Sequence, residues 1–585
     1  MTCRRDRPAF LLAAVALGLG SCGKPGAGLA PVESARAELA AGNATDARIK
    51  LEKLVADGTE RSEVAAYLGE AALAQGDLGA AHGWLGDGAF SPETSAHGFR
   101  MLGRLYFARG NLAAAGQAFD RSLAIEPGNP ELWVDIGRLR YRGGEQLQAL
   151  EAGAKAVALD PRNAAALQFR GQLARDAQGL IAGAEWFARA LEAQPGNVDL
   201  RVEYAATLGD VGRPRTALAI LRGGKGSSVS SPRGLFVQAV IAARGGHALL
   251  ARELLQRSGF ERDNVPAAMM LSAIVDLQAG NHASAVQTLD RLYRRQPDNG
   301  RVVDLLAFAL SRTGGERELI RRFAARAENP LGTPYLRTLV ARSYEALDDR
   351  TGAARFLDMA ASTREGFAIL PGDAPPEALE AGSSGDGLGA RDFVRNALAG
   401  HQMAAAVQRA RDFARRFPGS GDAHAILGDA ELAAGNKAAA RAAYLRSAAV
   451  RRSWPLILRL VRSQPDRASA RRLLEGYVRN NPGNGDAAAM LADAYAAQGQ
   501  WARAAVLLDH AMALGQSRVP WVVAARSLAA SKLGDRQAAL DFALEAHALQ
   551  PMNPSAIAAL IAALPAQEAA ARDELRSKLR SLTAR

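Results

Sequence analysis

Eight histidines are the side chains of this 585-residue chain best suited to bind a metal ion or to move a proton near neutral pH. No two of them stand four residues apart, the spacing that would put both rings on one face of a helix. The two cysteines, Cys3 and Cys22, stand far from every histidine. We therefore predict no metal site, and we expect the histidines to occupy surface or packing positions.

Phosphate binding has one superficial signal, the glycine-rich run from Gly223 to Ser228 that includes Lys225. The run lacks the Gly-x4-Gly-Lys-Ser/Thr order of a phosphate loop, and no β-strand pattern precedes it. The sequence also lacks the Gly-x-Ser-x-Gly motif of a serine nucleophile. Since nearly all other residues belong to the repeats described next, no stretch is long enough for a catalytic domain. The sequence predicts a protein that is not an enzyme and uses no cofactor.

The segments that must position any binding side chain recur every 34 residues, the distance between Pro127, Pro161 and Pro195. If these prolines are position 32, repeats begin at residues 28, 62, 96, 130, 164, 198, 232, 266, 300 and 334, and each repeat is named by its first residue. Position 8 is then always Gly or Ala. Position 15 is Gly except at Gln178 and Asp348, and position 20 is Ala except at Gly183 and Leu319.

Each recurring residue type has a structural reason. Small residues at positions 8 and 20 let two helices approach closely, and a large residue at position 24 fills the space between neighbouring repeats. Gly at position 15 suits the left-handed backbone that ends a first helix, and Pro at position 32 ends the second helix. One helix pair cannot bury its apolar face alone, so we expect the pairs to stack into an array.

Two repeats match a known pattern most fully. Repeat 96 has Phe99, Leu102, Gly103, Tyr106, Ala115, Phe119 and Pro127, and repeat 130 has Trp133, Ile136, Gly137, Ala149, Ala156 and Pro161. The chain thereby resembles the tetratricopeptide repeat family over nearly all of its length after the N-terminal segment. The resemblance implies an all-α fold, a right-handed superhelical solenoid of helix-turn-helix repeats. It also implies a concave groove lined by positions 2, 5, 9 and 12 of each first helix.

The repeat register breaks after residue 363, where prolines and a Gly/Ser-rich run at 382–387 indicate a loop or insertion. Repeats resume near residues 387, 421, 451, 485 and 520, although the step from 421 to 451 is four residues short. The predicted organisation is a signal segment at 1–21, a tether at 22–30, an N-terminal array at 31–363, an insertion or linker at 364–392, a C-terminal array at 393–565 and a capping helix at 566–585. A frayed tail is the alternative to the capping helix.

Arginine, aromatic and amide side chains occupy the predicted groove of repeats 96, 130 and 164. Cations beside aromatic rings suit an acidic peptide or a sugar polymer that bears carboxylates. Position 9 would form a ladder of Arg104, Arg138 and Gln172 along the groove. A hydrated groove without a dedicated ligand is the alternative. The predicted groove residues are Arg100, Arg104, Phe107, Arg138, Tyr141, Arg142, Gln168, Gln172 and Arg175.

A second basic cluster stands in the C-terminal array of this chain, whose formal net charge is +12. It would suit a polyanion such as an anionic polysaccharide or lipid headgroups, and a solvated helix face is the alternative. By contrast, Asp422, Asp429, Asp486 and Asp493 fall on the C-terminal groove. The predicted polyanion patch consists of Arg451, Arg452, Arg459, Arg462, Arg471 and Arg472.

The first residues have the features of a targeting segment. Arginines at 4, 5 and 7 precede an apolar run that is too short to span a bilayer, and Leu19-Gly20-Ser21-Cys22 follows. This sequence resembles the lipobox of bacterial lipoproteins, which implies that Cys22 is lipidated. Gly23 after the cysteine favours the outer membrane by the sorting rule of such proteins. An ordinary secretory signal is the alternative.

These observations lead to one expectation of function. We expect a scaffold without enzymatic activity, anchored by lipid to the bacterial outer membrane and facing the periplasm, that binds partner proteins of the envelope. Similar repeat lipoproteins act in exopolysaccharide export and in the sorting systems linked to it. The alternative is direct binding of an anionic polysaccharide through the arginine-rich surfaces. Nucleic acid is not expected as a partner, because the segment before Cys22 predicts export.

Overall fold

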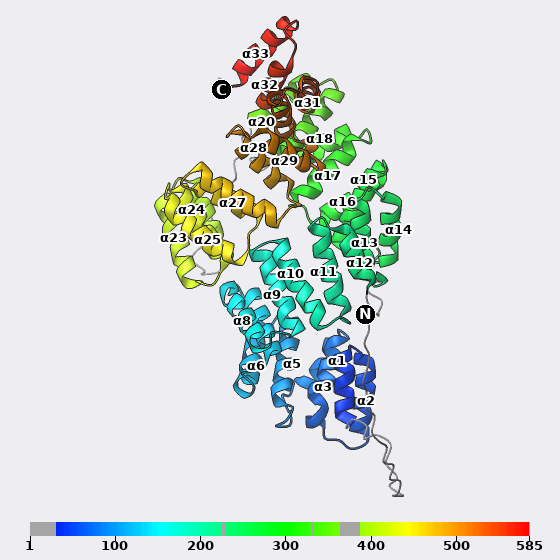
Figure 1. Cartoon of the computed structure of the whole chain (residues 1–585). Helices are drawn as coiled ribbons and strands as arrows, with labels where there is room; N and C mark the ends of the chain where they lie inside the picture. The colour runs from blue at the N-terminus through cyan, green and yellow to red at the C-terminus, as the bar shows by residue number, and fades with distance from the viewer. Residues whose placement is uncertain (1–30, 224–228, 330–331, 363–386, 584–585) are drawn as a thin grey trace, which may run out of the picture. The chain divides into compact units, whose positions relative to one another are not determined.

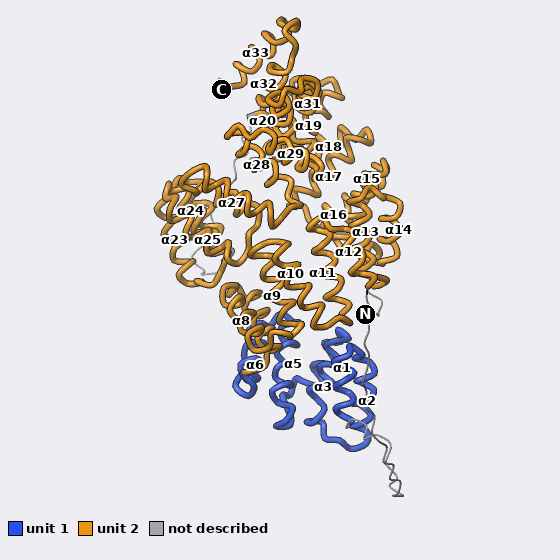
Figure 2. The backbone as a smooth tube through the Cα atoms, in the orientation of Figure 1, with its two compact units in different colours: residues 1–127 blue, residues 128–585 orange. Residues whose placement is uncertain are grey.

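The computed structural model describes residues 31–223, 229–329, 332–362 and 387–583, and within these ranges the chain is all-α, without a strand (Figure 1). Its helices follow one another as antiparallel pairs. The chain divides into two compact units, one up to Pro127 and one from Gly128 onward (Figure 2). The division falls inside the predicted N-terminal array.

The first unit contains three helix pairs. They are α1 (Pro31–Ala41) with α2 (Ala44–Ala56), α3 (Arg61–Ala74) with α4 (Leu78–Leu85), and α5 (Ser95–Ala108) with α6 (Leu112–Ile125).

The second unit begins with seven pairs that complete the N-terminal array. They are α7 (Pro130–Arg142), α8 (Gln146–Leu159), α9 (Ala164–Ala177), α10 (Leu180–Ala193), α11 (Val198–Asp210), α12 (Pro214–Arg222), α13 (Pro232–Arg244), α14 (Ala248–Ser258), α15 (Pro266–Gln278), α16 (His282–Arg295), α17 (Gly300–Ser311), α18 (Glu316–Glu328), α19 (Pro334–Ala346) and α20 (Arg350–Ser362).

The C-terminal array belongs to the same second unit. Its elements are α22 (Gly387–Ala399), α23 (Met403–Arg416), α24 (Gly421–Ala433), α25 (Lys437–Val450), α26 (Trp454–Ser463), α27 (Arg467–Asn480), α28 (Gly485–Ala496), α29 (Trp501–Ala513), the short 3-10 helix η3 (Gln516–Arg518), α30 (Pro520–Lys532), α31 (Arg536–Leu549), α32 (Pro554–Ala563) and α33 (Ala569–Thr583).

The predicted repeat register is confirmed helix by helix. From α7 to α19, every first helix begins at the first residue of its predicted repeat, from Pro130 to Pro334. The glycines at position 15 adopt the left-handed backbone, as Gly110 does with φ +79°. Asp348 adopts it too, with φ +60°, although it carries a side chain. In repeat 164, where Gln178 replaces the glycine, the positive φ moves to Gly179.

Position 8 makes room for the large side chain at position 24 of the same repeat. A Cβ added to Gly103 would lie 2.4 Å from the ring of Phe119, which is buried. Repeat 130 has Gly153 at position 24 instead, and Phe169 of the next repeat lies against both Gly137 and Gly153. The missing volume in one repeat is therefore supplied by its neighbour.

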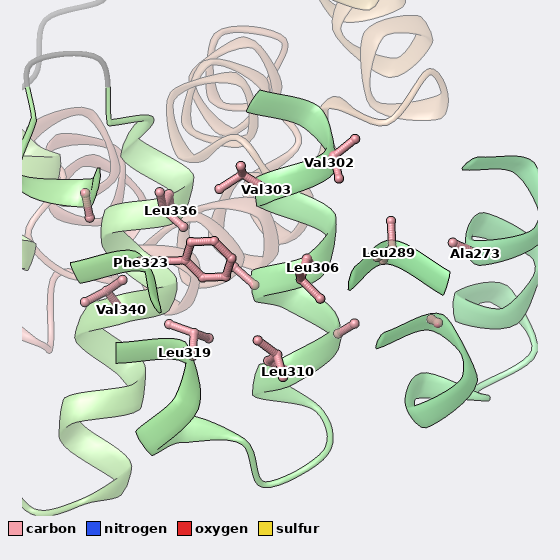
Figure 3. Packing of buried hydrophobic residues seen from close by; sticks show 14 of the residues in the cluster. Ala273, Leu289, Val302, Val303, Leu306, Leu310, Leu319, Phe323, Leu336 and Val340 are labelled. Atoms are coloured by element: carbon pink, nitrogen blue, oxygen red, sulfur yellow. The ribbon is translucent and has the colours of Figure 1, made fainter. Parts of the chain in front are cut away.

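The core is a row of apolar contacts between neighbouring pairs. Around Phe323, side chains of α17, α18 and α19 interdigitate, with Leu306, Leu319 and Val340 almost fully buried (Figure 3). Leu289 of α16 extends the same cluster toward the preceding repeats. Stacking thus buries what one pair would leave exposed.

Three details of the C-terminal half bear on the predicted boundaries. Helix α22 begins at Gly387, so a full helix pair starts within the range assigned to the insertion. The four-residue deficit after residue 421 shortens one first helix, α26, to 10 residues. Helix α33 has no buried residue, and its Leu575 packs, partly buried, against the end of the core.

The C-terminal array folds back onto the N-terminal part of its own unit. Near α8 and α9, the backbone N–H of Leu147 donates to the carbonyl of Gly419 (3.1 Å), and the N–H of Arg452 donates to the carbonyl of Asp176 (2.8 Å). A Cβ on Gly179 would lie 2.8 Å from the Cβ of Asn480, which shows how close the backbones are. We call this contact the proximal junction. A second contact, the distal junction, joins η3, the end of α31 and the loop before α32 to α17 and α19.

Candidate interaction surfaces

First helices of the first unit carry a polar and aromatic cluster. The ring of His97 on α5 stacks on Tyr67 of α3, with centroids 5.1 Å apart, and its Nε2 lies 2.9 Å from a carboxylate oxygen of Glu70. The guanidinium of Arg36 on α1 lies 5.5 Å from the centre of the Tyr67 ring. Burial raises the pKa of Glu70, but the hydrogen bond with His97 and the charges of His97, Arg104 and Arg100 outweigh it, so the pKa lies below its ordinary value.

The three predicted groove residues of this unit differ in exposure. Arg100 is 8% exposed and is thus largely inside the array, whereas Arg104 and Phe107 are half-buried. Arg104 lies 3.8 Å from the sulfur of Met101 and, like Arg100, acts on Glu70. This cluster therefore combines three arginines with one carboxylate, and Arg36 is its exposed cation.

Three predicted groove residues of the second unit converge on one internal carboxylate. Glu203 of α11 accepts hydrogen bonds from Gln168 (2.7 Å), from Gln172 (3.1 Å) and from Arg175 (3.3 Å). The Glu203 side chain is only 13% exposed. The structure brings these three side chains together, and their donors are bonded to a residue of the next repeat.

The other three groove residues lie at the end of α7. Arg138 is 3.8 Å from Asp135, and the hydroxyl of Tyr141 donates to Asp176 at 2.9 Å. Burial, followed by the charge of Asp176, raises the pKa of Tyr141 to about 12. Arg142 is exposed.

The proximal junction brings the two predicted binding regions together. Arg451 of the C-terminal array acts electrostatically on Tyr141, and the backbone of Arg452 is bonded to Asp176. Asp422 also acts on Tyr141 and partly offsets the positive charge.

The arginines of the predicted polyanion patch differ in their exposure and in their contacts. Arg459 forms an ion pair with buried Asp429 (2.9 Å), which also accepts a hydrogen bond from Tyr444 (2.7 Å). Burial raises the pKa of Asp429 to about 6, although Arg459 and Tyr444 both act to lower it. Arg471 is paired with Glu475 at 3.2 Å. The exposed members are Arg451, Arg452, Arg462 and Arg472.

Sequence reasoning missed the residues on which these networks centre. Glu203 stands at position 6, outside the four groove positions considered. The distal junction uses Phe308, Tyr335 and Thr338, which stand at positions 9, 2 and 5 of their repeats. Applying the groove positions to repeats 300 and 334 would have selected them.

Cys22, the predicted lipid attachment site, and the phosphate-loop-like residues 224–228 lie outside the described residues. Across the described ranges, no helix combines the length and the apolar character needed to cross a membrane. In the same ranges, no group of three or more His, Cys, Asp or Glu side chains could hold a metal ion.

Comparison with known proteins gives matches in separate stretches. Models of the tetratricopeptide repeat match residues 95–130, 391–455 and 461–522. The cellulose synthase 2 operon protein C of Komagataeibacter xylinus is 27% identical over 299 residues, which are 48% of this chain and 20% of that protein. The match thus spans about a fifth of the relative's length.

Two solved structures are among those similar to this chain. The Cut9–Hcn1 hetero-tetramer of the APC/C has a chain with a TM-score of 0.34 and 14% identity, covering 88% of this chain and 99% of that one. PilW, a type IV pilus biogenesis factor, has a TM-score of 0.30 and 19% identity, covering 33% of this chain and 94% of that one. The repeat matches and the helix pairs in a 34-residue register lead to one conclusion: this chain contains tetratricopeptide repeats.

Proposed function

We propose that this protein is a scaffold without enzymatic activity that binds partner proteins through the faces of its first helices. The observation that carries the proposal is the cluster on α1, α3 and α5, where the exposed Arg36 and the half-buried Arg104 supply cationic surface around the ring of Tyr67, which is itself buried. Such a surface suits an acidic segment of a partner, because guanidinium groups bind carboxylates through paired hydrogen bonds.

We place the scaffold in the export or assembly of an exopolysaccharide at the bacterial envelope. The similarity to a cellulose synthase operon protein supports this placement. We further propose that lipidated Cys22 anchors the chain to the outer membrane, facing the periplasm, and that its partners are envelope proteins. The lipobox-like sequence before Cys22 supports the anchor.

Crosslinking in intact cells tests the scaffold. The wild-type chain, a Cys22→Ala variant and an Arg36→Glu/Arg104→Glu variant would be purified from membranes, and captured proteins identified by mass spectrometry. We expect wild type to capture a defined set of envelope proteins, Cys22→Ala to leave the membrane fraction, and the double reversal to lose at least one partner.

The matched control is Arg162→Glu/Arg291→Glu, which makes the same charge change at two exposed residues outside the first helices. Equal capture by the groove variant and by wild type would reject the groove of the first unit as the partner surface. Membrane retention of Cys22→Ala would reject the anchor.

A second candidate function is direct binding of an anionic polysaccharide, favoured by the exposure of Arg451, Arg452 and Arg472. Retention on an immobilised polyuronate would then weaken with added salt and fall in Arg451→Glu/Arg452→Glu, relative to the Arg162→Glu/Arg291→Glu control. If neither added salt nor charge reversal changed the retention, this function would be rejected.

A further inference from the structure

Arg518 of the C-terminal array lies on two aromatic side chains of the N-terminal array. Its guanidinium carbon is 4.4 Å from the centre of the Phe308 ring on α17. The charge of the guanidinium also acts on the phenol of Tyr335 on α19. A cation above a ring and beside a phenol oxygen is a favourable arrangement for a guanidinium group. The two aromatic residues therefore form an acceptor surface for arginine.

The acceptor is held by well-packed helices. Leu306 and Leu310, which flank Phe308 on α17, and Leu336, which follows Tyr335 on α19, are buried in the cluster around Phe323. The Phe308 ring also meets the edge of His282 at a centroid distance of 6.3 Å. Since these neighbours fix the helices on both sides, the acceptor is preformed in the N-terminal array.

A short turn presents Arg518 to this acceptor. Helix α29 ends at Ala513, Gly515 takes φ +102°, η3 spans Gln516–Arg518, and Pro520 begins α30. Gly515 is required at this point, because side-chain-bearing residues rarely adopt that φ. Arg518 stands at the end of the turn, and it remains exposed although it touches Phe308 and Tyr335.

Other groove positions of the same repeats are covered by the C-terminal array as well. Gln550 donates to the hydroxyl of Thr338, and Arg342 donates to the carbonyl of Ala548, both at 3.4 Å. Positions 2, 5 and 9 of repeat 334 and position 9 of repeat 300 thus all contact residues of the same chain. These are the positions through which the resemblance to the family predicts partner binding.

The two junctions differ in their contacts. The proximal junction has backbone hydrogen bonds of 2.8 and 3.1 Å and a closely approached Gly179. The distal junction has one cation–ring contact, side-chain hydrogen bonds at 3.4 Å, near the limit for such bonds, and the packing of partly buried Met552 against the cluster around Phe323. Separation at the distal junction therefore disrupts fewer strong contacts than separation at the proximal one.

We propose that Phe308 and Tyr335 form a binding site for an arginine side chain of a partner protein, and that Arg518 of the same chain occupies this site until the partner replaces it. The inference deepens the scaffold function and rests on it, because it names the chemistry of one partner. Binding of that partner releases the distal end of the C-terminal array.

The probe is a fluorescent peptide with the sequence of residues 512–521, which carries its own arginine. Its binding would be measured by anisotropy to the purified full chain and to an Arg518→Ala variant. We expect at least tenfold tighter binding to Arg518→Ala, because the site is vacated. A peptide with alanine in place of arginine should not bind, and Phe308→Leu or Tyr335→Phe added to Arg518→Ala should weaken binding. Circular dichroism verifies that each variant is folded, and Arg518→Gln serves as a second vacated variant.

A disulfide that keeps the distal junction closed tests whether the peptide displaces Arg518. Thr338→Cys and Gln550→Cys would be joined by a disulfide in a background with Cys3→Ser and Cys22→Ser. With Arg518 present, the oxidised chain should bind the peptide at least tenfold more weakly than the reduced chain, and equal binding would overturn the displacement. Equal peptide binding by wild type and Arg518→Ala, or by the peptide without arginine, would show that Arg518 is only a structural contact. Neither result depends on the capture of cellular partners, so this inference and the scaffold proposal can fail separately.

Discussion

Asp304 gives the sharpest prediction of stability against pH. It stands on α17 one turn before Phe308, and it accepts a hydrogen bond from Thr333 at 3.0 Å. Burial raises its pKa from 3.8 to about 6, even though Thr333 and the charge of Arg326 lower it. At neutral pH the folded chain therefore holds an ionised carboxylate in a poorly solvated place.

The sign and size of the effect follow from linkage between protonation and folding. A carboxyl whose pKa is higher in the folded state contributes stability below the unfolded pKa, and the contribution is lost as pH rises through the folded pKa. The shift from 3.8 to about 6 corresponds to about 3 kcal/mol. With a reduction for partial exposure to solvent, we expect about 2 kcal/mol.

Asp304→Asn keeps the acceptor oxygen for Thr333 and removes the charge. We expect the variant to raise the free energy of local unfolding of α17 and α19 by about 2 kcal/mol at pH 7, and by only about 0.5 kcal/mol at pH 4. Native-state hydrogen exchange on peptides from these helices measures this local quantity. It is preferable to a global melt, because long repeat arrays do not unfold in a single step.

Asp290→Asn is the matched control with the opposite sign. Burial acts to raise the pKa of Asp290, but the hydrogen bonds and charges of Arg322 and Arg294 outweigh burial, so the pKa lies below its ordinary value. The ionised carboxylate therefore stabilises the fold at neutral pH, and this stabilisation is lost as the pH falls. Asp290→Asn should therefore reduce protection at pH 7. If Asp304→Asn gave no gain at pH 7, or an equal gain at pH 4, the assignment of a costly charge to Asp304 would be wrong.

Three further predictions concern packing, backbone and charge. Gly428→Ala should destabilise α24 and α25 by about 1–3 kcal/mol, because the new Cβ would lie 2.3 Å from the ring of Tyr444. Hydrogen exchange on peptides from these helices measures the loss, and unchanged protection would contradict the contact. Asp348→Gly should stabilise the turn between α19 and α20 by about 1 kcal/mol, because glycine adopts the left-handed backbone with φ +60° without strain. A loss of stability in this variant would show that the aspartate side chain stabilises the turn. Arg459→Ala should cost about 3–5 kcal/mol of local stability at pH 8 and less at pH 5, where Asp429, with a pKa of about 6, is protonated. Hydrogen exchange on peptides from α24 and α26 at both pH values tests this, and equal losses would refute it.

The fold was predictable because its determinants are local and repeated. Position 15 supplies a left-handed residue and positions 8 and 24 supply matched volumes, so each repeat specifies its own helix pair. The shortened helix α26 also follows from the sequence, because the step from the repeat at 421 to the repeat at 451 is four residues short. The helix starts from Pro130 to Pro334 follow directly from this periodicity.

The networks of the groove were less predictable, because they depend on contacts between repeats. The periodicity placed Gln168, Gln172 and Arg175 on one face, but not the carboxylate of Glu203 that accepts from all three. The pairing of Arg459 with Asp429 was visible in principle, because both stand at position 9 of consecutive repeats. Reading the arginines as one charge cluster obscured it.

The fold-back could not be predicted from periodicity at all. The distal junction is made by side chains, but the hydrogen bonds of the proximal junction come from backbone groups of loop residues such as Gly419 and Arg452. Backbone donors and acceptors are the same in every residue, so no residue type announces such a junction. The predicted ligands of the groove and of the exposed arginines stay predictions.

The two junctions also constrain how the length of this protein can change. An open array gains or loses a 34-residue repeat at small cost, because each repeat touches only its neighbours. In this protein the C-terminal array is held against the N-terminal array at two places, the proximal junction near α9 and the distal junction near α19. Deleting one repeat between the two junctions, such as residues 232–265, would shorten the N-terminal array but not the C-terminal array. The C-terminal array would then be too long to make both contacts, and one of the junctions would separate. The number of repeats between the two junctions is thus fixed by the architecture of this chain, whereas the number of repeats outside them is not.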